Sequence, residues 1–105
     1  MTNRENRYHQ AVTKGHSAAW DQEWDKAANF YRQALDAKPD DSNALNSLAL
    51  ALYEMQEYEE SLQFYLRVVE KLPQDPVSLE KVARIYEILN RSKIGSETAV
   101  RAAEL

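Results

Sequence analysis

The sequence predicts an all-α fold, an α-solenoid of three helix–turn–helix repeats. Three observations predict it. One apolar pattern occurs twice, 34 residues apart, which is the period of a stacked helical hairpin. The two copies read Ala27-x3-Tyr31-x2-Ala34-Leu35-x3-Pro39 and Ser61-x3-Tyr65-x2-Val68-Val69-x3-Pro73. The 105 residues include only 2 Gly and 3 Pro, too few for many turns between strands. Apolar residues between the turns follow the 3.6-residue helical period.

Six helices are expected. In the first, about residues 5–20, the small residues Ala11, Gly15 and Ala18 share one face. Residues 21–23 interrupt the pattern, and a second helix runs to about Lys38, where the following proline disfavours helical geometry. Its apolar stripe is Trp24, Ala27, Ala28, Tyr31, Ala34 and Leu35.

The third and fourth helices form the second unit. Asp40, Asp41 and Ser42 offer capping oxygens to the third. Its expected buried face is Leu45, Leu48, Ala49 and Leu52, and that of the fourth helix is Tyr58, Leu62, Tyr65, Val68, Val69 and Leu72.

The fifth helix is expected to begin at Asp75-Pro76, an N-cap acceptor followed by a proline suited to the first turn. Its expected buried face is Leu79, Val82, Ala83 and Tyr86.

The third repeat weakens at its end. Gly95 takes the place of Ala27 and Ser61, and glycine costs a helix about 1 kcal/mol relative to alanine. The repeats then cover about 8–41, 42–75 and 76–105. No further helix is expected over the apolar edge formed by Ala99, Ala102, Ala103 and Leu105. The chain is therefore expected to be a piece of a longer protein, an uncapped array, or a chain that meets a partner subunit at this edge.

Composition disfavours several functions. Net charge is −4, so nucleic-acid binding through a basic surface is not expected. The absence of cysteine and of long apolar stretches indicates a cytoplasmic protein without a membrane segment. His9 and His16 lie about 10 Å apart along a helix, too far to share a metal ion. With no cofactor or nucleophile motif, neither an enzyme nor a cofactor is expected.

With these residues assembled, the chain resembles the tetratricopeptide repeat family. The pattern Gly15, Ala27, Tyr31, Ala34 and Pro39 carries the resemblance. The departures are Ala11 and Lys14 in the first unit, Gln22 and Gln56 in the turns, and Ala49. The resemblance implies a right-handed superhelix with a concave groove lined by the first helix of each pair.

Family positions carried over to this sequence place a peptide groove on three helices. Its expected principal residues are His16, Trp20, Asn43, Asn46, Leu50, Tyr53, Lys81 and Arg84. Trp20 is open to two interpretations, a groove anchor or packing between repeats. At the positions of the clamp that holds chaperone C-termini, the chain has Val12, His16, Ser47, Val77 and Lys81, so that ligand is not expected.

The leading functional hypothesis is therefore a non-catalytic adaptor that binds a peptide or helix of another protein in this groove. Two alternatives stay open. One is self-association through the uncapped C-terminal helix. The other is a secretion-type chaperone, a role that the resemblance associates with small acidic proteins of three such repeats.

Overall fold

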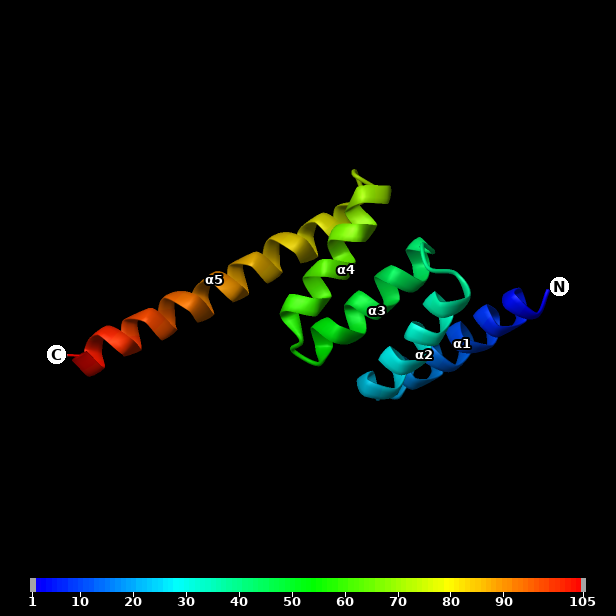
Figure 1. Ribbon diagram of the computed structural model, residues 1–105, viewed down its shortest axis with the longest axis horizontal. Coiled ribbons are helices and arrows are strands. Elements are labelled where there is room, and N and C mark those ends of the chain that lie inside the picture. The colour runs from blue at the N-terminus through cyan, green and yellow to red at the C-terminus, as the bar shows by residue number, and fades with distance from the viewer. Residues whose placement is uncertain (1, 105) are drawn as a thin grey trace.

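Four helices form two antiparallel pairs, and a long fifth helix follows them (Figure 1). The structure is a computed structural model that describes the backbone of residues 2–104 and the side chains of residues 2–92. Its helices are α1 (Asn3–Trp20), α2 (Trp24–Ala37), α3 (Ser42–Glu54), α4 (Tyr58–Lys71) and α5 (Pro76–Glu104). Each helix packs on the next one along the chain, as expected for stacked hairpins. The all-α prediction is confirmed.

The turns within the two pairs have the same geometry. Gln22 and Gln56, 34 residues apart, adopt positive φ angles of 58° and 64°. After each of them, a backbone N–H returns to the preceding helix: Glu23 donates to Ala18 and Glu57 donates to Leu52, both at 2.9 Å. This is the Schellman arrangement, which satisfies the free carbonyls of a helix end. Each helix that follows begins with a half-buried aromatic residue, Trp24 or Tyr58.

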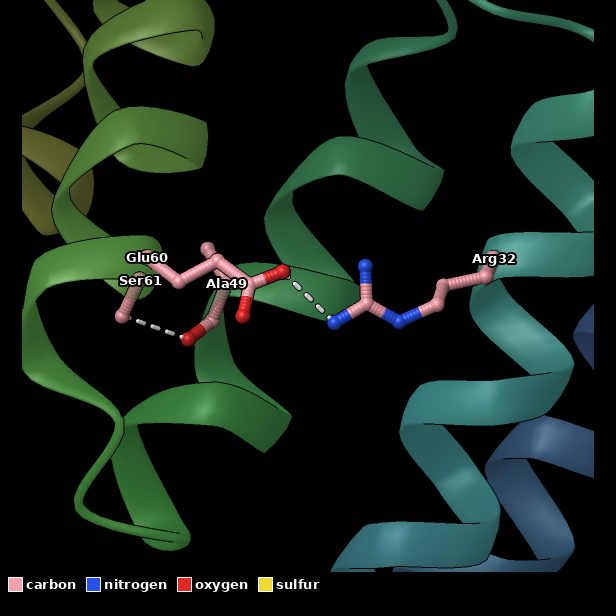
Figure 2. Close-up of polar contacts among 4 residues, drawn as sticks. All are labelled: Arg32, Ala49, Glu60 and Ser61. Carbon is pink, nitrogen blue, oxygen red and sulfur yellow. Dashed lines mark hydrogen bonds and ion pairs between the residues drawn. The ribbon is translucent and has the colours of Figure 1, made fainter.

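Close contact inside each pair depends on small residues. In the first pair, Gly15 lies against the ring of Tyr31, and Ala27 is fully buried. In the second, the hydroxyl of Ser61 on α4 donates to the carbonyl of Ala49 on α3 at 2.7 Å (Figure 2). Because Ser61 is fully buried, this hydrogen bond satisfies its hydroxyl where water has no access.

The two pairs are joined through both of their helices. Asp41 caps α3 by accepting from the Ala44 N–H at 2.9 Å and also accepts from the Tyr8 hydroxyl at 2.5 Å. The guanidinium of Arg32 on α2 lies 2.6 Å from Glu60 on α4 (Figure 2). The Arg32–Glu60 pair is exposed and contributes little to stability, whereas the Tyr8–Asp41 contact is partly buried.

The prediction of six helices is wrong: residues 76–104 form a single helix, α5, so the expected third hairpin is not formed. In the 34-residue register, Ser92 takes the place of Trp24 and Tyr58. A serine supplies no ring to pack on the core, so nothing comparable holds the start of a separate helix at that point.

The expected buried face of α5 is also largely wrong. Ser78 and Ile85 are fully buried and Val82 is half-buried, whereas Leu79, Ala83 and Tyr86 are exposed. The residues that pack on α4 are therefore those that face the preceding helix. The other face lacks the second helix of its own pair. Leu72, expected in the core, is 47% exposed at the C-cap of α4.

Candidate peptide-binding groove

The first helices α1 and α3 are linked through a tyrosine on the second helix between them. His16 Nδ1 of α1 lies 2.7 Å from the Tyr31 hydroxyl of α2. Burial raises the pKa of Tyr31, and a hydrogen bond with Ser47 of α3 acts in the opposite direction. The Tyr31 hydroxyl thus contacts side chains from both first helices, and His16 and Ser47 border a continuous surface.

A second contact joins α3 to α5. The ammonium group of Lys81 lies 4.2 Å from the centroid of the Tyr53 ring, and Tyr53 meets Tyr58 edge to face with the centroids 5.5 Å apart. A cation over an aromatic face is held by the ring quadrupole and keeps its N–H groups available to an anion. This part of the surface can therefore receive a carboxylate beside an aromatic ring.

Asn46 of α3 carries a buried acceptor. Among the described residues, its side-chain oxygen Oδ1 has no hydrogen-bond partner. A buried polar atom left unpaired costs about 1–3 kcal/mol. A backbone N–H from a bound peptide would pair with it, so Asn46 is suited to fix an extended chain on α3.

The other predicted groove residues occupy two environments. Those exposed to solvent are His16, Trp20, Asn43, Leu50 and Arg84, and those half-buried are Asn46, Tyr53 and Lys81. Arg84 lies 3.3 Å from Glu80, one turn earlier on α5. Because the Arg84–Glu80 pair is exposed, it binds the guanidinium only weakly.

Trp20 is the most exposed large apolar residue described. It ends α1 and is 89% exposed, so the interpretation that Trp20 packs between repeats is wrong. Trp24, by contrast, packs against the core cluster that contains Ala27 and Tyr31.

Sequence reasoning missed one residue of this surface, Tyr31. Its repeated aromatic position and helical spacing indicate only a core residue. The signal that it carries is the choice of tyrosine over phenylalanine, because a buried tyrosine hydroxyl usually has a polar partner. Identifying that partner as His16 requires the structure.

Other surface features lie apart from the groove. A hollow of about 250 Å³ lies between α1 and α2, and its charged lining residues are Arg7, Lys14 and Asp36. Within the part of the chain that the structure describes, no three potential metal-ligand side chains of His, Cys, Asp or Glu come together. None of the described helices has the length and apolarity needed to cross a membrane.

Comparison with known proteins agrees with this architecture. The family model described as tetratricopeptide repeat matches residues 6–76, which span α1 to α4 and reach the first residue of α5. The chain belongs to the tetratricopeptide repeat family. No curated protein matches it. Proteins of this family generally mediate protein–protein interaction and are typically non-catalytic scaffolds.

Proposed function

We propose that this protein is a non-catalytic adaptor that binds an extended peptide or short helix of a partner protein along α1, α3 and α5. The observation that carries the proposal is the unpaired, buried oxygen of Asn46. Near it in the chain, α3 also presents Leu50, which is exposed, and Tyr53, which is half-buried. A polar atom that lacks a partner beside apolar side chains is typical of a surface that a ligand completes.

The contacts of the groove favour one class of peptide. Tyr53 and Leu50 offer apolar area, and Lys81 is held over the Tyr53 ring with its charge available. Arg84 adds a second cation one turn beyond Lys81. We therefore expect the peptide to carry an apolar side chain followed or preceded by an acidic one.

Peptides selected from a random phage-displayed library test this proposal. The dissociation constant of a selected peptide is measured by fluorescence anisotropy for the wild type and for Asn46→Ala/Tyr53→Ala/Arg84→Ala. The triple variant is expected to bind at least about 100-fold more weakly, since a few anchors carry most of the binding energy.

A matched control separates the groove from general damage. Gln33→Ala/Gln63→Ala/Glu70→Ala removes three exposed side chains from α2 and α4 and is expected to bind like the wild type. Far-UV circular dichroism checks that both triple variants keep their helices. Equal affinity of the groove variant and the wild type would reject the groove.

Self-association is a second candidate, and the exposure of Leu79 and Tyr86 on α5 favours it. The edge expected from the sequence, Ala99, Ala102, Ala103 and Leu105, lies outside the residues whose side chains are described. A mass that rises with concentration in light scattering, and falls in Ala102→Glu, would support this candidate. The chaperone alternative stays a prediction from the resemblance; binding of an exported substrate on co-expression tests it.

A further inference from the structure

One face of α5 is exposed where the same face of α1 and α3 is covered. Leu79, Ala83 and Tyr86 follow Leu45, Ala49 and Leu52 by 34 residues. The three residues of α3 are almost fully buried, and α4 packs on that helix. Leu79 and Tyr86 are 43% and 51% exposed. This face of α5 therefore has the composition of a helix-packing surface without a covering helix among the described side chains.

The opposite end of the array is polar. Gln10, Lys14 and Ser17 of α1 precede Ala44, Leu48 and Ala51 by 34 residues, and all three are exposed. Their counterparts on α3 are buried in the stack. An apolar face on α5 would bury Lys14 if copies stacked head to tail, which is unfavourable. Two α5 faces meeting each other avoid this cost and give a closed, two-fold pair.

The chain's own C-terminal segment fits the exposed face by register. Gly15 packs against Tyr31 in the first pair. The same antiparallel register, moved by two periods, sets Ala83 opposite Ala99. It also sets Tyr86 opposite Gly95 and Leu79 opposite Ala102, which the sequence requires for no other evident reason.

Side-chain sizes agree with this register. Tyr86 is larger than Ala18 and Leu52, which hold its place in the earlier units. Its opposite residue, Gly95, is smaller than Ala27 and Ser61. Exchange of size between facing positions keeps the packed volume, which is the kind of change that helix interfaces tolerate best.

Within one copy, the straight course of α5 carries this segment away from the face (Figure 1). Asn90 holds the place of Gln22 and Gln56, the residues whose positive φ angles turn the first two pairs. In α5, residue 90 is helical. A second copy reaches the face without any turn, because its own α5 is already straight.

We propose that two copies of this chain exchange their C-terminal segments, so that residues 92–104 of each cover Leu79, Ala83 and Tyr86 of the other. The inference rests on self-association as the second candidate function and is independent of groove binding. Two straight, antiparallel α5 helices then supply the sixth helix that each chain lacks.

Cross-linking between two single-cysteine chains tests the exchange, since the wild type has no cysteine. Ala83→Cys and an affinity-tagged Ala99→Cys are mixed, equilibrated and treated with a short bismaleimide. The expected product is a cross-linked heterodimer. The matched mixture of Gln63→Cys with Ala99→Cys, where residue 63 is exposed on α4, is expected to give little product.

Residue 90 provides an independent readout. Asn90→Ala favours the straight helix, whereas Asn90→Gly favours the turn. Their dimer dissociation constants, from light scattering over a concentration series, are expected to differ about fivefold for each exchanged helix. Asn90→Ala is expected to be the tighter dimer.

Three results would overturn the proposal. A wild-type mass of 12.1 kDa at all concentrations would overturn both the exchange and self-association. A dimeric mass without Ala83–Ala99 cross-linking would overturn only the exchange. A cross-link formed within single chains of the double variant Ala83→Cys/Ala99→Cys would show instead that the segment folds back on its own helix.

Discussion

Gly15 of α1 and Tyr31 of α2 are in such close contact that a Cβ atom on residue 15 would lie 2.5 Å from Cε1 of the ring. Tyr31 is buried, and its hydroxyl lies 2.7 Å from His16. The ring therefore has little room to move. The spacing of the first helical pair depends on the missing side chain.

Gly15→Ala is expected to destabilise the protein. Overpacking costs about 1–3 kcal/mol, and alanine recovers about 1 kcal/mol through its helix propensity. The net loss in the free energy of unfolding is up to about 2 kcal/mol, measured by urea denaturation. Thr13→Ala at an exposed position of the same helix is the control and is expected to be neutral or slightly stabilising. A gain in both variants would contradict the close contact.

Ser61→Ala removes the buried hydrogen bond to the Ala49 carbonyl. We expect a loss of about 1 kcal/mol, the typical net value of one intramolecular hydrogen bond. Ser17→Ala, at an exposed position, serves as the comparison. If thermal unfolding shows both variants equally stable, the Ser61 hydroxyl has no structural role.

Tyr8 makes stability depend on alkaline pH. Burial, together with the hydrogen bond to Asp41 and its charge, raises the pKa of Tyr8 to about 12 from an ordinary value of 10.0. Because the folded value is the higher one, the stabilisation is complete below pH 10 and is lost as pH rises towards 12. Tyr8→Phe is expected to lose less stability than the wild type across this range, in urea titrations at successive pH values. Identical pH dependence would argue against the Tyr8–Asp41 contact.

Trp20→Ala separates binding from folding. Because the side chain is 89% exposed, its removal is expected to change the free energy of unfolding by no more than about 0.5 kcal/mol. If Trp20 anchors the partner, the selected peptide binds about 30-fold more weakly, the effect of losing a 2 kcal/mol anchor. Unchanged peptide affinity would remove Trp20 from the groove while leaving the fold intact.

The first four helices could be predicted because local signals and packing agree there. Ala27 and Ser61 are small where two helices meet, and both are fully buried. Asp41 accepts the capping hydrogen bond that its position before α3 predicts. Such features depend on residues close in sequence or on the repeat period.

The errors arose where a neighbouring helix decides the outcome. Both Ile85 and Tyr86 are apolar, so sequence alone does not tell which faces the core. Ile85 is buried because α4 packs on α5, and Tyr86 is exposed because the expected sixth helix does not fold back. In the same way, the contact between His16 and Tyr31 joins residues 15 positions apart and leaves no local signal.

The most direct test of the account is an NMR titration of the isotope-labelled protein with a library-selected peptide. If the first helices line the binding surface, amide shifts will change most on α1, α3 and the N-terminal half of α5, around His16, Asn46, Tyr53 and Lys81. Changes confined to α2 and α4, around Gln33 and Gln63, would contradict the account.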